Sequence, residues 1–256
     1  MQLFDEPETS EDKPSSKAAA ISAGIYRKGE ETRARFLKAA LQLFGREGFD
    51  SVTTRQIAQA AGASLPTLNY YFGDKEGLYL ACAAALAERF DQALAATSSG
   101  ALEALKTSME PDTARLHLKR IFRELIPFLL TEEDAHAWGS FVQREMAKPG
   151  AAYEILYVRV WAPGIELATE LICRMQDEAV NATEARIRAI LLFSSLTAFQ
   201  SERPAVMRVV GQAVSLAEQA AIVTRMICHE IDGIGPCAAE PQERDPRPDL
   251  SRLRRP

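Results

Sequence analysis

The chain has 256 residues, a formal net charge of −5, 47% hydrophobic residues and 7% aromatic residues. This length is enough for one large domain or two small ones with a sizeable buried core. Regular alternation of apolar and polar residues is scarce, so the sequence predicts an all-α protein. No apolar run approaches the ~20 residues that a membrane helix needs, which argues against a membrane-spanning protein.

The cysteines and histidines do not indicate a metal or redox site. There is no C-x-x-C pair, the cysteine spacing matches no zinc-ligand pattern, and the histidines are scattered. The sequence therefore implies no metal and no cofactor. The polar, acidic N-terminus lacks the apolar core of a signal peptide, which predicts a cytoplasmic protein with free thiols. These residues are Cys82, Cys173, Cys228, Cys237, His117, His136 and His229.

The first 28 residues are rich in Glu, Pro, Ser and Lys and are predicted to form a disordered tail. A sharper alternative is an arm that enters the minor groove of DNA, because basic residues precede the first expected helix. Those basic residues are Lys13, Lys17, Arg27 and Lys28.

The first helix is predicted from about Glu30 to Glu47. Its apolar residues recur at helical spacing and define a face for burial. Glu30 and Glu31 lie in the first turn, where the helix dipole favours anions. Gly48 follows, as the residue that adopts the left-handed conformation at the end of a helix. The apolar positions are Phe36, Ala40, Leu43 and Phe44.

Two short helices with a turn between them follow. The first is predicted from Thr54 to Ala61, with Thr53 or Thr54 as its N-cap and Gly62 at its end. Ile57 and Ala61 lie one turn apart on this helix and face inward. The segment therefore begins and ends at residues that favour helix boundaries.

Ser64 is a good N-cap for the second short helix, and Pro66 lies in its first turn, where a proline loses no hydrogen bond. Leu68 and Phe72 lie one turn apart and face the core, so the residues between them point elsewhere. Two short helices joined by a glycine-containing turn are the layout of a helix-turn-helix.

The chain beyond is expected to be helical, with breaks at proline and glycine. Asp74 is predicted to cap a helix that starts at Lys75 and ends near residues 97–100, and Pro204 is predicted to open a short turn. Further helices are expected at about residues 111–130, 132–148, 151–176 with an interruption at 163–164, 183–200 and 211–231. The predicted domains are a tail at 1–28, a helix-turn-helix domain at 29–80, a helical domain at 81–234 and a disordered tail at 235–256.

Charge supports DNA binding only weakly. Between Arg27 and Leu80 there are eight lysine and arginine residues and six aspartate and glutamate residues, for a net charge of +2. The acidic excess therefore lies outside the proposed DNA-reading segment, and the distribution matters more than the total.

The segment TTRQIAQAAGASLPTLNYYFGDKEGLY resembles the DNA-binding domain of the TetR/AcrR family of bacterial transcriptional regulators. The shared pattern is a threonine-rich start, I-A-x-x-A-G-V-S, a small residue or proline, T-L-Y-x-H/Y-F and K-x-x-L. It covers about 50 residues, from Gly29 to Leu80. The remainder has the length of the family's helical ligand-binding and dimerising domain.

The resemblance implies which residues contact DNA. Thr54 and Arg55 would start a helix that crosses the phosphate backbone, and Lys75 would hold a phosphate at a helix N-terminus. Asparagine can bond bidentately to adenine, and leucine or proline can touch a thymine methyl group. The implied DNA-contacting residues are Thr54, Arg55, Leu65, Pro66, Thr67, Asn69, Tyr70, Tyr71 and Lys75.

Two positions depart from the family pattern. Asn69 stands where the family usually has tyrosine, and Leu65 stands where a polar residue is common; both affect the target sequence and not the fold. For Tyr70 and Tyr71 the alternative to DNA contact is partly buried packing.

Seven aromatic residues of the helical remainder are candidates to line a ligand pocket between helices. Ordinary helical core is the alternative for each of them. Arg144, Glu145 and Arg159 lie beside this set in the sequence, where surface salt bridges explain them equally well. The candidate pocket residues are Trp138, Phe141, Tyr153, Tyr157, Trp161, Phe193 and Phe199.

The resemblance predicts a homodimer that binds a palindromic operator in double-stranded DNA as a repressor, and that a small-molecule effector releases. The segments NYYFGDKEGLY and QREMAKPGAAYEILYVRV are similar to one branch of the family. That branch includes a regulator linked to sensitivity to cephalosporin and chloramphenicol antibiotics, which implies control of transport, efflux or detoxification genes.

Other classes of protein have less support. There is no P-loop, G-x-S-x-G or H-E-x-x-H motif, so the sequence does not predict an enzyme. The alternative is a helical protein-interaction adaptor without sequence-specific DNA binding. An adaptor has no need of the cap at Ser64, of outward tyrosines or of Lys75, and this favours the regulator.

Overall fold

The computed structural model of the protein describes residues 16–176, 182–201, 203–211 and 213–235. Within these ranges the chain is helical and has no strand, which confirms the all-α prediction. No helix in the same ranges is long and apolar enough to cross a membrane. The helices are α1 (Ser16–Glu47), α2 (Thr54–Ala60), α3 (Leu65–Phe72), α4 (Lys75–Leu105), α5 (Pro111–Thr131), α6 (Ala135–Ala147), α7 (Ala151–Leu156), the π-helix η1 (Tyr157–Trp161), α8 (Ala162–Met175), α9 (Ala182–Ser201), α10 (Arg203–Val210) and α11 (Leu216–Gly233).

The chain forms two compact units. The first, here the head unit, runs to Ala87 and also includes Ala137–Leu156. The second, here the body unit, contains Glu88–His136 and the chain from Tyr157 onward. This division differs from the single boundary expected at residues 80 and 81, because α7 and most of α6 belong with the helix-turn-helix segment.

Helix α1 begins much earlier than the sequence analysis expected. It starts at Ser16, so residues 16–28 are helical where a disordered tail was predicted, while residues 1–15 lie outside the described part. The early stretch SKAAAIS is rich in good helix formers and joins a helix that is already nucleated, and these features favour extension. Of the residues suggested for a minor-groove arm, Lys13 lies outside the described residues, and Lys17, Arg27 and Lys28 lie on the helical backbone of α1.

The run at residues 97–100 does not end α4, which continues to Leu105. The Thr97 hydroxyl donates to the carbonyl of Leu94 at 3.1 Å, and the Ser99 hydroxyl donates to the carbonyl of Ala95 at 2.6 Å. Hydroxyl side chains that bond back to helix carbonyls are tolerated inside helices, which explains why this polar run is no break.

The expected interruption at residues 163–164 appears one turn earlier, as the π-helix η1. Pro163 has no N–H and cannot close a hydrogen bond to the preceding turn, so the helix widens before it. Helix α11 also starts later than expected, at Leu216. Gly211 has a φ of +89°, and Ser215 forms a capping box with Glu218 that fixes the start.

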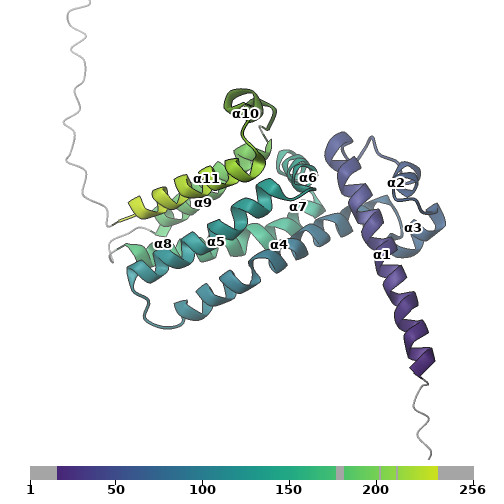
Figure 1. The fold of residues 1–256 in the computed structure, drawn as a ribbon, viewed down its shortest axis with the longest axis horizontal. Coiled ribbons are helices and arrows are strands. Elements are labelled where there is room, and N and C mark those ends of the chain that lie inside the picture. The colour runs from purple at the N-terminus through teal and green to yellow at the C-terminus, as the bar shows by residue number, and fades with distance from the viewer. Residues whose placement is uncertain (1–15, 177–181, 202, 212, 236–256) are drawn as a thin grey trace, which may run out of the picture. The chain divides into compact units, whose positions relative to one another are not determined.

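The body unit is built around α5, which packs against α11 and α8, while α8 packs against α9 (Figure 1). Phe122 is fully buried and lies 5.1 Å from the ring of Phe193, and the Phe90 and Phe128 rings lie 4.9 Å apart. The body core therefore draws on α4, α5, α8, α9 and α11. Short helix α10 occupies the place of the turn expected at Pro204.

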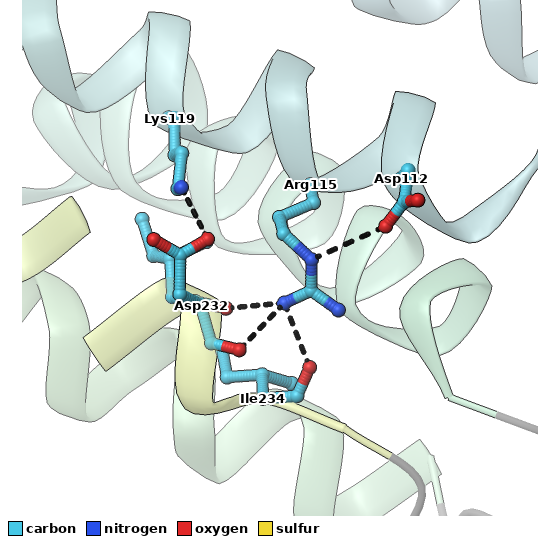
Figure 2. Close-up of polar contacts among 6 residues, drawn as sticks. Asp112, Arg115, Lys119, Asp232 and Ile234 are labelled. Carbon is cyan, nitrogen blue, oxygen red and sulfur yellow. Dashed lines mark hydrogen bonds and ion pairs between the residues drawn. The ribbon is translucent and has the colours of Figure 1, made fainter. Parts of the chain in front are cut away.

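Arg115 ties α5 to the end of α11 (Figure 2). Its Nη1 donates to the carbonyls of Ile231, Asp232 and Ile234 at 2.6, 3.2 and 2.8 Å. These carbonyls lie where a helix leaves acceptors without partners, and a cation there is favoured by the helix dipole. Lys119 adds an ion pair with the Asp232 carboxylate, which lowers the pKa of that carboxyl group.

We expect Arg115→Met to destabilise the body by about 2 kcal/mol, because three carbonyls, two of them in partly buried hydrogen bonds, lose a charged donor. The Arg115 side chain is only 18% exposed, so solvent does not replace it easily. The measurement is the midpoint of urea unfolding followed by circular dichroism. Arg123→Met, at an exposed position on the same helix, is the matched control and should change stability by less than about 0.5 kcal/mol. Equal effects of the two substitutions would contradict this role.

Candidate DNA-binding site

The core of the head unit holds α1, α2 and α3 together. Phe36, Ile57 and Leu68, one from each helix, are all fully buried. Val52 before α2 and Leu78 on α4 are fully buried as well. The inward positions predicted for Leu68 and Ile57 are confirmed, and Figure 1 shows α2 and α3 beside the C-terminal half of α1.

The N-terminus of α2 is fixed by a capping box. The Thr53 side chain accepts from the backbone N–H of Gln56 at 3.3 Å, and the Gln56 side chain accepts from the backbone N–H of Thr53 at 2.7 Å. Thr53, one of the two predicted candidates, is therefore the N-cap. Thr54, partly exposed, and Arg55, exposed, follow in the first turn of α2.

The turn and the start of α3 follow the prediction. Gly62 has a φ of +60°, a conformation that side chains with a Cβ rarely adopt. Ser64 is the N-cap of α3, and its hydroxyl accepts from the backbone N–H of Thr67 at 3.3 Å. Pro66 lies in the first turn. Local sequence therefore sets both ends of the turn that aims α3.

The outer face of α3 is open to solvent. Tyr70 is 83% exposed, and Asn69 and Pro66 are exposed too. Leu65 and Thr67 are partly exposed. An aromatic side chain this exposed contributes little to the fold of its own helix, which makes Tyr70 available for a contact outside the chain.

Tyr71 lies differently from Tyr70. Its ring centroid lies 6.5 Å from that of Phe36 and 5.3 Å from that of Tyr70, and the residue is half-buried. A Cβ on Gly29 of α1 would lie 3.2 Å from the Tyr71 hydroxyl oxygen. Tyr71 therefore packs against α1 and presents only part of its surface.

Lys75 is the first residue of α4, three residues after the end of α3. Its Nζ lies 4.4 Å from the centroid of the Phe49 ring and donates to the carbonyl of Asp50 at 3.5 Å. Asp74 caps α4, because its Oδ1 accepts from the backbone N–H of Gly77 at 2.8 Å. The lysine charge is thus held at a helix N-terminus, a place that favours phosphate.

Arg35 was not among the residues expected to lie near the reading surface. This exposed arginine of α1 has its Nη1 3.7 Å from the place that a Cβ on Gly62 would occupy. It therefore puts a positive charge beside the turn between α2 and α3. The only signal for it in the sequence is its place on the polar face of α1, next to Phe36.

The seven aromatic candidates for a ligand pocket are divided between the two units. Trp138 and Phe141 are buried in the head unit, 3% and 0% exposed, and Tyr153 also lies there. Phe193 and Phe199 pack against the body core, whereas Tyr157 is 44% exposed. The fourth of the set in the body, Trp161, is partly exposed at the end of η1.

An open groove of about 620 Å³ lies within the head unit. It is bordered by the loop after α1, by the start of α4 and by the turn between α6 and α7. Its lining includes Glu76, Tyr79, Arg144, Glu145 and Lys148. For Arg144 and Glu145 the sequence left open a place beside the pocket or a surface salt bridge. The exposed Arg144 donates to the backbone carbonyls of Gly45 and Arg46, and the buried Glu145 accepts from the Tyr79 hydroxyl.

The capped pair of short helices, with an exposed face on the second, defines a DNA-binding protein of the helix-turn-helix class. Residues 36–82 match the tetR family of bacterial regulatory proteins. Residues 114–234 match the C-terminal domain of the HTH-type transcriptional dual regulator CecR. The chain is also 30% identical over 207 residues to CecR of Shigella flexneri, an alignment that covers 80% of this chain and 92% of that protein. The chain therefore belongs to the TetR family, in the group with a CecR-type C-terminal domain.

A further relative matches a shorter segment of the chain, and a solved structure has a similar fold. The regulatory protein RaaS of Mycobacterium tuberculosis is 46% identical over 63 residues, which are 25% of this chain and 29% of that protein. A transcriptional regulator from Pseudomonas aeruginosa PAO1 has a similar fold, with a TM-score of 0.55 and 19% identity over 79% of this chain and 87% of that one. The match to the tetR family and the alignment with CecR show that the chain is a DNA-binding transcriptional regulator.

Proposed function

We propose that the chain is a homodimeric repressor that a small molecule releases from a palindromic operator. The observation that carries this proposal is the solvent-exposed face of α3, with Pro66, Asn69 and Tyr70 on a helix whose other face is buried. Such a helix can enter the major groove while its buried face stays packed against the rest of the head unit. The adaptor alternative gives no reason for this face.

The proposed DNA contacts are those implied by the family pattern. Asn69, Pro66 and Tyr70 are all exposed, which leaves their side chains free to meet base edges. Tyr71, packed against α1, would use its hydroxyl on a phosphate. Polar or basic residues at the helix N-termini, with backbone N–H groups, position the head on the phosphates. They are Thr54, Arg55 and Lys75, and Leu65 and Thr67 complete the proposed set.

The dimer is proposed to form through α9 and α11. Ile187, Ile190 and Leu191 follow one another at i, i+3 and i+4 on α9 and are 51%, 42% and 63% exposed. On α11, Ile222 and Met226 lie one turn apart, at i and i+4, and are 39% and 63% exposed. Large apolar side chains grouped this way mark a surface for a protein partner. Ala189 of α9 is buried within the body unit and is not part of this surface.

The effector is proposed to bind within the body unit. Tyr157, Trp161, Phe193 and Phe199 are the aromatic candidates that lie there, and none of them is fully buried. A small apolar or aromatic molecule suits such surroundings. Binding would favour a spacing of the two heads that no longer matches two operator half-sites. The resemblance of two segments to the branch of the family linked to antibiotic sensitivity motivates transport, efflux or detoxification genes as the proposed targets.

The proposal is tested by selection from a pool of random-sequence DNA duplexes with the purified full-length chain. The expected result is an enriched, palindromic duplex that is bound far more tightly than a scrambled duplex at moderate salt. Gel filtration of the complex should then show two chains on each duplex. Equal affinity for selected and scrambled DNA would overturn the proposal and leave the adaptor.

Tyr70→Ala is expected to weaken binding to the selected duplex by about 10- to 100-fold, as the loss of one good base contact does. Helicity and dimerisation should stay unchanged, because the side chain is 83% exposed. Fluorescence anisotropy with the selected duplex gives the affinity, and circular dichroism gives the helicity. Leu102→Ala, at a large apolar position of the body unit that is 53% exposed and lies outside the proposed dimer and effector surfaces, is the control and should retain wild-type affinity. Unchanged affinity of Tyr70→Ala would contradict the contact.

A further inference from the structure

Helix α6 makes an unusually close contact with α1 inside the head unit. A Cβ on Gly45 of α1 would lie 2.7 Å from the backbone carbonyl oxygen of Ala137, closer than such atoms approach. Gly45 therefore lets the two backbones touch. Trp138 and Phe141 of α6 are buried next to this contact, so the helix is part of the head core.

Arg144 of α6 caps the C-terminal end of α1. Its Nε donates to the carbonyl of Gly45 at 3.0 Å, and its Nη2 donates to the carbonyl of Arg46 at 2.8 Å. These carbonyls belong to the last turn of α1, where the helix itself supplies no donors. Gly48, with a φ of +84°, would bring a Cβ to 3.1 Å from Nη1 of Arg144, so the guanidinium fills the space that this glycine leaves.

Glu145, the next residue, holds the start of α4. It is 7% exposed, and its Oε1 accepts from the hydroxyl of Tyr79 at 2.6 Å. Its Oε2 accepts from the backbone N–H of Tyr153 at 2.9 Å, which joins α7 to the same point. Burial and the carboxylate both raise the pKa of the Tyr79 hydroxyl, so it remains a donor.

Tyr79 connects the Glu145 carboxylate to the turn between α3 and α4. Its ring lies 4.9 Å from those of Phe44 and Phe49 and 4.8 Å from that of Phe141. The Nζ of Lys75 in turn lies over the Phe49 ring. Lys75 is the first residue of α4 and lies three residues beyond the end of α3. A continuous set of contacts therefore runs from Glu145 to the turn that follows α3.

We propose that Arg144 and Glu145 are positioning residues for DNA recognition, because they fix the end of α1 and the start of α4 between which α2 and α3 are held. Neither residue needs to touch DNA. The proposal rests on the proposed function of α3 as the reading helix. Arg144 and Glu145, although distant from α3 in the sequence, would set the angle at which α3 meets the major groove.

The experiment compares full-length variants on the duplex that the wild-type chain selects and on a scrambled duplex. Glu145→Gln removes the negative charge and replaces one of the two carboxylate acceptors by a donor, so that the side chain can no longer accept from both the Tyr79 hydroxyl and the Tyr153 N–H. Arg144→Met removes both caps on α1. Each should lower affinity for the selected duplex by about tenfold or more and leave affinity for the scrambled duplex within about twofold. The matched controls are Glu154→Gln and Lys148→Met, at exposed neighbouring positions, which should retain wild-type affinity.

A purely structural role predicts a different pattern. It would lower the unfolding midpoint, whereas the folded fraction, measured well below that midpoint, would bind both duplexes as the wild type does. Arg144→Lys, which keeps the charge and one donor, should restore part of the lost selectivity. Wild-type selectivity in Glu145→Gln and Arg144→Met would overturn the inference. Failure of the wild-type chain to select any duplex would instead overturn the proposed function.

Discussion

Replacing both Leu191 and Met226 by glutamate should convert the proposed homodimer into folded monomers and lower operator affinity by about 100-fold or more. Both side chains are 63% exposed in the single chain, so a carboxylate at either position remains hydrated in a monomer. In a dimer through α9 and α11 the same carboxylates would be removed from water and brought close to their own copies, which strongly opposes association.

The loss of DNA affinity follows from the loss of the dimer. Two reading helices on one rigid dimer bind two half-sites at a high effective concentration, an advantage of about 10²- to 10⁴-fold that a monomer lacks. Sedimentation velocity over a range of concentrations measures the assembly, and fluorescence anisotropy with the selected duplex measures the affinity.

Leu102→Glu is the matched control for this prediction. Leu102 is also a large exposed leucine, 53% exposed on α4, and lies outside the proposed interface. It should leave both assembly and affinity unchanged. The dimer proposal fails if the double variant sediments as the wild type does, or if the wild type is a monomer at every concentration.

Phe141→Ala is expected to destabilise the protein by about 3–5 kcal/mol without any ligand present, the usual cost of emptying a fully buried phenylalanine site. Phe141 is 0% exposed, and its ring lies 4.8 Å from that of Tyr79. The cavity would open directly beneath the start of α4. We therefore also expect DNA binding to fail at temperatures where the wild type still binds.

This result separates two roles for Phe141. A pocket-lining residue that waits for a ligand would contribute little to the stability of the free protein, whereas a core residue contributes its full burial. Urea unfolding of the ligand-free chain is the measurement. Tyr157→Ala, at an aromatic position that is 44% exposed, should cost less than about 1 kcal/mol under the same conditions. A similarly small cost for Phe141→Ala would return it to the ligand-pocket candidates.

The reading segment was predictable from the sequence because short-range interactions set it. Ser64 bonds to an N–H three residues away, Asp74 bonds to the N–H of Gly77, and Leu68 is buried as its helical spacing requires. Such contacts join residues a few positions apart, so they can be predicted from the order of the residues. The outward direction of Tyr70 followed from the same spacing.

Other local patterns were misleading where neighbouring turns outweighed them. The hydroxyl-rich run at residues 97–100 was expected to end a helix, yet Ser99 satisfies its hydroxyl on the carbonyl of Ala95 and α4 continues. Residues 16–28 were expected to belong to a disordered tail, yet they extend a helix that Phe36 and its neighbours already anchor. Propensity over a few residues is a weak guide beside a helix that is already formed.

The role of the segment at residues 137–156 was decided by the tertiary structure alone. Its aromatic residues have the helical spacing of any buried helix, and nothing in that spacing says which unit they join. Arg144 caps a carbonyl 99 residues earlier in the chain, and Glu145 accepts from a hydroxyl 66 residues earlier. The sequence by itself determined that a helix-turn-helix forms, because caps and periodicity act within a few residues. What supports it depends on contacts between distant segments, which only the packed fold brings together.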